Sequence, residues 1–243
     1  EETMGRLMRD DFRPYSDELF IATKAGYDMW EGPYGNWGSR KYLMASLDQS
    51  LKRMGLDYVD LFYSHRYDPA TPLEETLQAM VDIVRQGKAL YLGISSWPLE
   101  ALKFADRYLR ERDVSLLIYQ GRLNMIDRAP QEEGILDYCH EHDIGFISFS
   151  PLAQGLLTDR YLNGIPADSR MAKERSLKHA ALTPELLARL KRWNAQASER
   201  DETLAEMALA WILHQKGVTS VLVGASSTAQ LEKDMKCVHA KTF

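Results

Sequence analysis

The stretch YVDLFYSHR, residues 58–66, decides the fold class of this chain of 243 residues. Its apolar centre is typical of a β-strand that is buried on both faces, and its last residues are polar. The same combination of apolar run and polar end recurs along the chain, with helical patterns between the runs. Because strands that alternate with helices pair in parallel through right-handed crossovers, the sequence predicts an α/β fold.

The predicted elements follow one another from start to finish. Strands are expected at residues 19–23, 58–63, 90–94, 116–119, 144–149 and 220–223. Helices are expected to begin at Ser39, at Thr71, after Pro98, at Thr183 and at Ser227. The residues Thr71-Pro72-Leu73-Glu74 have the pattern of a capping box with proline at the first helical position. Residues 151–179 form a longer irregular stretch than a connection requires, which indicates a binding loop or lid.

Two architectures fit this alternation, a doubly wound sheet and a (β/α)8 TIM barrel. In a barrel every strand end points at one axial site, whereas a doubly wound sheet gathers its chemistry at one switch point. Hydrogen-bonding groups end every predicted strand here, namely Thr23-Lys24, Ser64-His65-Arg66, Ser95-Ser96, Gln120, Ser150 and Ser226. No Gly-x-Gly-x-x-Gly follows any strand. The pattern therefore favours a single barrel domain over residues 1–243, with its first two strands expected before residue 1.

Composition limits the classes of function. Apolar residues make up 45% and charged residues 27% of the chain, which is typical of a soluble globular protein. A net charge of −5 without a basic block argues against nucleic acid or a membrane surface as a partner. Cys139 and Cys237 are isolated, so neither a disulfide framework nor a metal site is predicted, and a reducing, cytoplasmic location is expected.

Lys24 and His65 are the candidate catalytic residues, because they end successive predicted strands and would face one cavity. A partly desolvated lysine acts strongly on neighbouring charges, and a neutral imidazole can donate a hydrogen bond to a carbonyl oxygen. The alternatives are a lysine that reaches solvent and a histidine that is satisfied in the core.

The next strand ends carry uncharged groups that suit a carboxamide such as that of nicotinamide. These groups are Ser95, Ser96 and Gln120, and turn-capping serines with a buried glutamine are the alternative reading. The residues Gly224-Ala225-Ser226-Ser227 lead into the last helix, where free N–H groups attract a phosphate. Arg160 and Arg170, in the long stretch after Pro151, are candidates to fold over an anion.

Aromatic residues gather in the predicted loops at the same end of the strands. Tyr27, Trp30 and Trp37 lie in the loop after Lys24, and Trp97 follows Ser96. Aromatic residues at a catalytic face are typical of substrate walls. A contact between copies of the chain in a homo-oligomer is the other role that they would suit.

Several stretches together resemble the aldo-keto reductase family, and they run through nearly the whole chain. They are residues 23–26, 38–40, 46–53, 57–60, 87–89, 93–96, 150–157 and 223–226. The similarity is greatest to the bacterial branch that includes L-glyceraldehyde 3-phosphate reductase, and potassium-channel beta subunits are a nearby branch. The channel branch usually has asparagine where this chain has His65, so the enzyme branch is the better match.

The resemblance implies a mechanism in which NADPH passes a hydride to a carbonyl carbon while a tyrosine gives the oxygen a proton. Lys24 matches the lysine that lowers the pKa of this tyrosine, and His65 matches the histidine that orients the carbonyl. The tyrosine and an aspartate paired with the lysine are expected just ahead of residue 1. A C-terminal cap is expected beyond Phe243, so the barrel is predicted to be incomplete at both ends.

The resemblance also implies a cofactor site. Ser95, Ser96 and Gln120 would hold the nicotinamide end. The remaining residues implied are Phe149, Ser150, Leu152 and Gly155 along the diphosphate, Arg160 and Arg170 over the phosphates, and Gly224, Ser226 and Gln230 on the adenosine side. The family often has Glu-Asn where this chain has Lys233-Asp234, which departs from its adenine-binding pattern.

The resulting expectation is an NADPH-dependent reductase of small aldehydes or ketones, such as L-glyceraldehyde 3-phosphate or methylglyoxal. Trp30, Arg66 and Trp97 are the predicted substrate contacts. The alternative is a redox-sensing regulatory subunit that binds the cofactor and a protein partner, like the channel beta subunits. A third expectation concerns the chain as a six-stranded piece, whose open strand edges predict aggregation and no activity in isolation.

Overall fold

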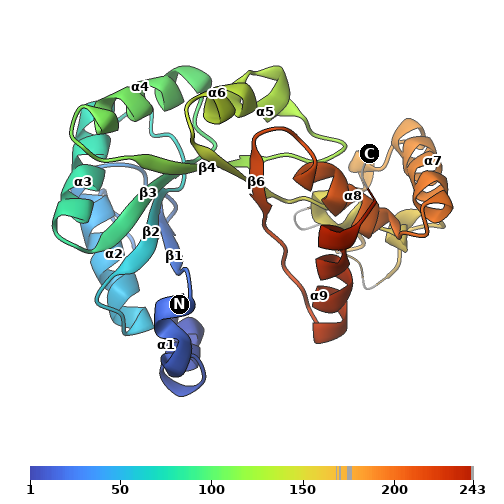
Figure 1. Ribbon diagram of the computed structural model, residues 1–243, viewed down its shortest axis with the longest axis horizontal. Coiled ribbons are helices and arrows are strands. Elements are labelled where there is room, and N and C mark those ends of the chain that lie inside the picture. The colour runs from blue at the N-terminus through green and yellow to red at the C-terminus, as the bar shows by residue number, and fades with distance from the viewer. Residues whose placement is uncertain (168, 170, 174–176, 242–243) are drawn as a thin grey trace. The chain divides into compact units, whose positions relative to one another are not determined.

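The computed structural model describes residues 1–167, 169, 171–173 and 177–241 (Figure 1). The chain forms two compact units, Glu1–Gln120 and Gly121–Phe243, and each is described by itself. The prediction of a single barrel domain over residues 1–243 stays a prediction.

A parallel sheet with alternating helices confirms the predicted α/β class. The described strands are β1 (Ala22–Ala25), β2 (Val59–Ser64), β3 (Ala89–Ser95), β4 (Leu116–Arg122), β5 (Gly145–Phe149) and β6 (Val218–Val221). They form a six-stranded sheet whose strand order follows the chain order. The registered pairs are parallel in both units. Adjacent parallel strands joined by helices are the arrangement of a partial (β/α)8 barrel.

The helices of the first unit cover its strands. They are α1 (Glu2–Asp10), α2 (Arg40–Met54), α3 (Leu73–Arg85) and α4 (Leu99–Arg110), with a 3-10 helix, η1, at Arg13–Glu18. Figure 1 shows α2 and α3 along the same side of β1, β2 and β3. Fully buried side chains from both layers, such as Leu47 and Leu77 with Phe62 and Leu92, form the core between them. Burial of these apolar surfaces holds the helices on the sheet.

Helix α2 has the ends that the sequence predicts. The Ser39 side chain accepts a hydrogen bond from the backbone N–H of Tyr42, which satisfies a free donor of the first turn. Gly55 ends the helix with φ 67°, a left-handed conformation that a residue without Cβ adopts at little cost. Local chemistry therefore sets both ends of the helix that follows the loop after β1.

The helices of the second unit pack around an apolar cluster of their own. They are α5 (Ala129–Glu132), α6 (Ile135–Glu141), α7 (Pro184–Glu199), α8 (Leu204–Leu213) and α9 (Thr228–Met235), with 3-10 helices η2 (Ala153–Gly155), η3 (Asp159–Tyr161), η4 (His179–Ala181) and η5 (Lys236–His239). Leu190 of α7 and Met207 of α8 pack with Leu157 in this cluster. The stretch after β5 therefore contributes to the core of its own unit.

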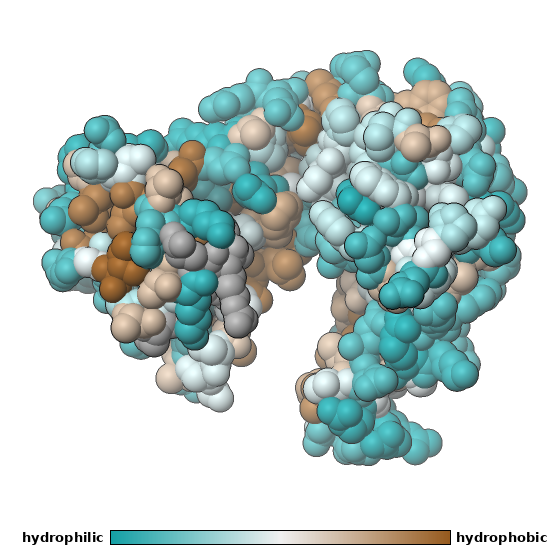
Figure 2. Space-filling model, turned by 180° about the vertical axis from the view of Figure 1, so that it is seen from behind, coloured by the Kyte–Doolittle hydropathy of each residue, from teal (hydrophilic) through white to brown (hydrophobic). Residues whose placement is uncertain are grey.

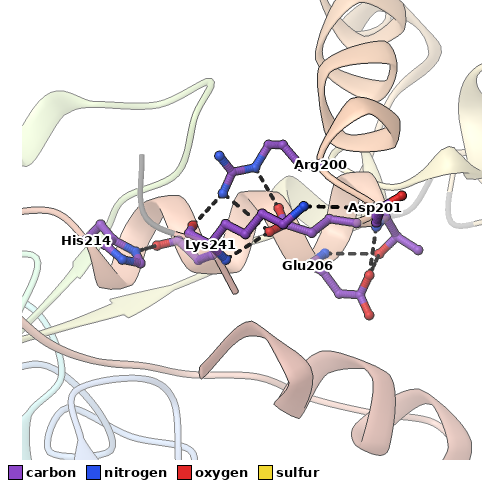
Figure 3. A network of polar contacts seen from close by, with 8 residues as sticks. Arg200, Asp201, Glu206, His214 and Lys241 are labelled. Carbon is purple, nitrogen blue, oxygen red and sulfur yellow. Dashed lines mark hydrogen bonds and ion pairs between the residues drawn. The ribbon is translucent and has the colours of Figure 1, made fainter. Parts of the chain in front are cut away.

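A polar network joins the α7–α8 turn to the last described residues (Figure 3). Arg200 Nε lies 2.9 Å from Glu202 Oε2, and Arg200 also donates to the carbonyl of Lys241. Thr203 and Glu206 form a reciprocal capping box at the start of α8, with Glu206 N–H 3.2 Å from the Thr203 hydroxyl. The network satisfies backbone groups at this helix start and holds the chain near Lys241 against it.

Two strand predictions are shifted along the chain. The first strand spans Ala22–Ala25 rather than residues 19–23, because Leu19 caps the 3-10 helix η1 and the pairing with β2 begins at Ala22. The last strand spans Val218–Val221 rather than residues 220–223, because its pairing with β5 begins at Val218. Pairing partners, which are distant in sequence, set these limits. Lys24 consequently lies within β1.

The capping box predicted at residues 71–74 is wrong. Pro72 is the N-cap of α3, and it makes no side-chain capping bond. The Thr71 hydroxyl instead donates to Asp68 Oδ2 at 2.6 Å. The carboxylate of Asp68 competes with the helix for this hydroxyl, so a matching motif did not produce the expected bond.

Figure 2 shows that hydrophilic residues cover most of the visible face, with smaller apolar patches between them. In the first unit the exposed apolar side chains include Phe20 and Tyr91, whose rings stack with centroids 6.2 Å apart. Scattered exposed aromatics of this kind are usual on protein surfaces. Within the described part of the chain, the helices are all too short or too polar to cross a bilayer.

Gly93 of β3 leaves room for the ring of Tyr63 on the neighbouring strand. A Cβ at this position would lie 2.5 Å from Tyr63 Cε1 and 3.2 Å from a methyl group of Ile118. Gly93→Ala is therefore expected to lower the free energy of unfolding by about 1–3 kcal/mol through overpacking, measured by urea denaturation. Adding Tyr63→Leu should recover part of this loss in a double-mutant cycle.

The matched control is Gly224→Ala, because a Cβ there would meet nothing within 4 Å. It is expected to change the free energy of unfolding by less than about 0.5 kcal/mol, as for an open site. Equal effects of the two substitutions would contradict the close approach of Tyr63.

Candidate active site

Lys24 and His65 lie at the same end of two neighbouring strands. Lys24 pairs in register with Tyr63, and the backbone N–H of His65 donates to the carbonyl of Ala25 at 2.8 Å. The Lys24 ammonium lies 4.9 Å from the centroid of the Tyr63 ring. Parallel pairing therefore brings together the two side chains that the sequence selected, from residues 41 positions apart by their numbers.

Burial lowers the pKa of Lys24 from its usual value of 10.5. Desolvation is the cause, because it penalises the charged form. No carboxylate forms an ion pair with Lys24 among the residues that the structure describes. The lysine is therefore a desolvated cation whose charge acts on the groups around it.

The pKa of His65 is held below its usual value of 6.5. Burial is the largest cause, and the positive charges of Lys24 and Arg66 add to it. All three disfavour a second proton on the ring, so the imidazole is neutral at pH 7. A neutral imidazole keeps one N–H, which can donate to a carbonyl oxygen without transferring its proton.

Tyr63 stays protonated at neutral pH, because burial raises its pKa to about 12. Lys24 lies over its ring face. A tyrosine that serves as a proton donor needs a lowered pKa, so this residue does not have that role. Its packing against Gly93 is structural.

The predicted substrate contacts differ in their surroundings. The Arg66 guanidinium and the Trp30 ring are both half-buried, and Trp30 packs against Tyr42 with centroids 5.4 Å apart. Trp97 is only 1% exposed, and its ring meets Tyr67 edge-on at 5.8 Å. The Trp97 Nε1–H has no hydrogen-bond acceptor within the described part of the chain. Trp97 is therefore buried in this structure, and its contact with a substrate stays a prediction.

The predicted carboxamide partners lie close together. Ser95 and Gln120 pair in register, and the N–H of Ser96 donates to the Gln120 carbonyl at 3.1 Å. Ser95 is 2% and Gln120 4% exposed. Neither side chain makes a hydrogen bond to another described residue, and neither is among the fully buried polar atoms that lack a partner. Their donors and acceptors fit a carboxamide ligand such as nicotinamide.

Ser96 has φ 56°, which is unusual for a residue with a Cβ. Strained backbone of this kind is often found where a side chain or N–H group is held for a ligand. The Ser150 backbone has the same property in the second unit, with φ 52° directly after β5. Ser96 after β3 and Ser150 after β5, both predicted to contact the cofactor, therefore have backbone in the left-handed region.

The residues predicted along the diphosphate surround η2 in the second unit. Phe149 ends β5, Leu152 is the N-cap of η2, and Gly155 is its last residue with φ 97°. The Gly155 carbonyl accepts from the Thr158 hydroxyl at 2.7 Å. A short, tight turn of this kind exposes backbone groups to a ligand without bulky side chains in the way.

The other residues predicted to contact an anion differ in the hydrogen bonds that they make. Arg160 belongs to η3, and its backbone N–H is held by the Thr158 hydroxyl at 3.2 Å. Arg170 lies outside the described residues. Gly224 and Ser226 precede α9, where Gln230 Oε1 accepts from both the N–H and the hydroxyl of Ser226 at 3.0 Å. A phosphate at this N–H would have to displace the Gln230 amide.

Two side chains that no sequence motif singled out hold the loop after β1. The Tyr42 hydroxyl accepts from the Gly26 N–H at 3.0 Å and donates to the Tyr27 carbonyl at 2.5 Å. Asp68 Oδ2 accepts from the Gly38 N–H at 2.9 Å. The dipeptide Asp68-Pro69 indicates a turn, so the sequence could have pointed to Asp68. No sequence motif points to Tyr42.

Asn124 is a third residue that sequence motifs did not indicate, and it organises the second unit. Its side-chain Oδ1 accepts from the N–H groups of Ile126 and Asp127, and its Nδ2 donates to the Ser150 carbonyl at 3.1 Å. This buried amide joins the loop after β4 to the end of β5. The bonds to Ile126 and Asp127 are local, whereas the bond to Ser150 spans 26 residues and is not revealed by local pattern.

Comparison with known proteins identifies the family. The model of the aldo/keto reductase family matches residues 1–242. The chain belongs to the aldo/keto reductase family. It is 53% identical over 248 residues to L-glyceraldehyde 3-phosphate reductase of Escherichia coli strain K12, covering 100% of this chain and 71% of that protein. It is 37% identical to a probable voltage-gated potassium channel subunit beta of Arabidopsis thaliana, covering 98% of this chain and 73% of that protein.

A second plant relative, a probable voltage-gated potassium channel subunit beta of Oryza sativa, is 36% identical over 244 residues. The family and its reductase relative support an oxidoreductase that acts on carbonyl groups. The predicted resemblance to this family is therefore confirmed, with both of the branches that it named. The roles of individual residues in this aldo/keto reductase stay predictions.

The neutral state of His65 is open to direct measurement. In an NMR titration assigned with His65→Gln, its imidazole should titrate below pH 6.5, because burial and two cations oppose protonation. Lys24→Met should raise this midpoint, since it removes one of the cations. A midpoint above 6.5 would contradict the electrostatic description of the site.

Proposed function

We propose that the protein reduces small aldehydes or ketones to alcohols with NADPH as the hydride donor. The observation that carries the proposal is the pair of Lys24 and His65 at neighbouring strand ends, where burial first and then the nearby cations lower the pKa of the imidazole. Membership of a carbonyl-reducing family supports the reaction class. We also propose that the protein acts in the cytoplasm and forms a homo-oligomer.

His65 would orient the substrate. Its neutral ring would donate an N–H to the carbonyl oxygen and hold the carbonyl carbon toward the hydride donor. Lys24 would act by charge on the proton donor of the reaction, which the family resemblance implies to be a tyrosine. A nearby desolvated ammonium favours the phenolate form, and so lowers the pKa of such a tyrosine toward neutral pH.

NADPH supplies the hydride when it is bound. We assign Ser95, Ser96 and Gln120 to its carboxamide, because the family resemblance implies that role and pairing of β3 with β4 brings the three residues together. The remaining assignments are Phe149, Ser150, Leu152 and Gly155 to the diphosphate, Arg160 and Arg170 to the phosphates, and Gly224, Ser226 and Gln230 to the adenosine side. Arg66, Trp30 and Trp97 are assigned to the substrate.

The proposed substrates are L-glyceraldehyde 3-phosphate and methylglyoxal. The first is supported by the 53% identical relative of that name. Both are small enough for a site between strand ends and aromatic loops. Small aldehydes of this kind expose the carbonyl to a hydride without steric hindrance.

Lys24→Met tests the proposal in the full-length protein. The substitution keeps the length and removes the charge, so the turnover number for NADPH oxidation with an aldehyde should fall by at least about 100-fold. Cofactor binding, followed by fluorescence, should change by less than about 3-fold. Unchanged turnover would rule out the role of Lys24.

The control for this substitution is Lys41→Met, because Lys41 lies over the exposed ring of Tyr34, in the loop before α2. It removes the same charge from the same unit and should leave the turnover number near that of the unmodified protein. A fall as large as for Lys24→Met would show that the effect is not specific to the site.

A regulatory role is the second candidate, and the plant channel-subunit relatives support it. In that role the protein would bind NADPH tightly, turn it over negligibly and form a stable complex with another protein. Multiple turnovers of an aldehyde in a simple assay would exclude this as the main role.

A further inference from the structure

The Arg66 guanidinium is held between two aromatic rings of the loop after β1. Its central carbon lies 3.5 Å from the centroid of the Trp37 ring and 4.5 Å from that of Tyr27. Its Nε donates to the carbonyl of Gly26 at 2.5 Å. Cation–π contacts with two rings and one hydrogen bond restrict the position of the group.

The loop that supplies these rings is itself firmly anchored. Trp37 has φ 70°, an uncommon conformation for a bulky residue, and its N–H donates to the Gly26 carbonyl at 3.2 Å. Gly38 is held on both sides, by Asp68 Oδ2 at its N–H and by the Thr76 hydroxyl at its carbonyl. Strain that the surroundings maintain around one side chain is typical of a functional site.

The two terminal nitrogens of Arg66 make no hydrogen bond or ion pair with the described residues. Among the described residues, no carboxylate forms an ion pair with Arg66, and its one protein hydrogen bond is made by Nε. A guanidinium that is stacked, oriented and without a carboxylate offers a planar fork of donors, which matches the oxygens of a phosphate or carboxylate.

The charges around Arg66 also favour the binding of an anion. His65 directly precedes Arg66, and its pKa is lowered by burial first and then by the charges of Lys24 and Arg66. The ring of Tyr27 contacts both Arg66 and His65, the latter edge-on with centroids 4.7 Å apart. An anionic group on the substrate would therefore be attracted to the side chain next to the one that orients its carbonyl.

We propose that Arg66 binds a terminal oxyanion of the aldehyde substrate and makes the enzyme selective for anionic aldehydes over neutral ones. The inference rests on the proposed reductase function. In that role the Tyr27–Trp37 pair acts as a clamp that holds the guanidinium ready for the anion, which reduces the entropy lost on binding. The competing role is a structural one, in which Arg66 only joins the two loops.

Matched pairs of aldehydes separate these roles in the full-length protein. Glyceraldehyde 3-phosphate is compared with glyceraldehyde, and succinic semialdehyde with butyraldehyde, so that each pair differs in a phosphate or a carboxylate. For Arg66→Gln, the ratio of kcat/KM between the anionic and the neutral member should fall by about 10- to 100-fold. A fall in one pair alone identifies the oxyanion that the site binds.

Arg66→Lys keeps the charge but loses the fork and the stacking, so its ratio should lie between those of the unmodified protein and Arg66→Gln. It also keeps the test decisive if Arg66→Gln does not fold. Arg40→Gln is the control, because Arg40 pairs with Asp82 away from the clamp, and its ratios should not change. Equal losses on both members of each pair, or a loss confined to the KM for NADPH, would overturn the proposal.

Binding of inorganic phosphate supplies a readout that needs no turnover. Because Trp37 stacks on Arg66, phosphate should change tryptophan fluorescence in the unmodified protein, and this change should be lost in Arg66→Gln. Phosphate binding without any aldehyde reduction would support the proposed anion site but exclude the proposed reductase function. Aldehyde reduction without an anion preference, and without phosphate binding, would reject the anion site and leave the reductase function standing.

Discussion

The parallel pairing of β1 with β2 is the constraint on which the site depends. It aligns Lys24 with Tyr63, and continues to Gly93 on β3, where the absence of a side chain makes room for the Tyr63 ring. That ring lies beneath the Lys24 ammonium. Because parallel strands present their carboxyl ends together, the same pairing brings His65 to the cation. A shift of register would separate these groups.

Electrostatics gives this strand end its chemical character. Lys24 and Arg66 are cations without carboxylate partners among the described residues, and both disfavour a charged His65. An uncompensated positive charge costs stability when it is desolvated, so it is retained where a ligand or substrate benefits from it. A neutral histidine between cations can position a carbonyl, and the cations can attract an anionic group.

Much of the architecture follows from local pattern. The strand–helix alternation, the Ser39 and Thr183 caps and the Gly55 helix end all appear in the structure, because they depend on residues a few positions apart. The shifted ends of β1 and β6 and the absent capping bond at Thr71 do not follow from it. The strand ends are set by pairing with a strand that is distant in sequence. At Thr71 a competing local partner, the Asp68 carboxylate three residues earlier, takes the hydroxyl.

The sequence by itself determined the family, the α/β class and the choice of Lys24 and His65, since these rest on residue identity and spacing. Only the tertiary structure decided the state of the residues around them. It buried Trp97, placed Arg66 against the rings of Tyr27 and Trp37, and left the Gln120 side chain without a hydrogen bond to another described residue. The physical reason is that burial, stacking and hydrogen bonding depend on loops and strands that meet only in the folded chain.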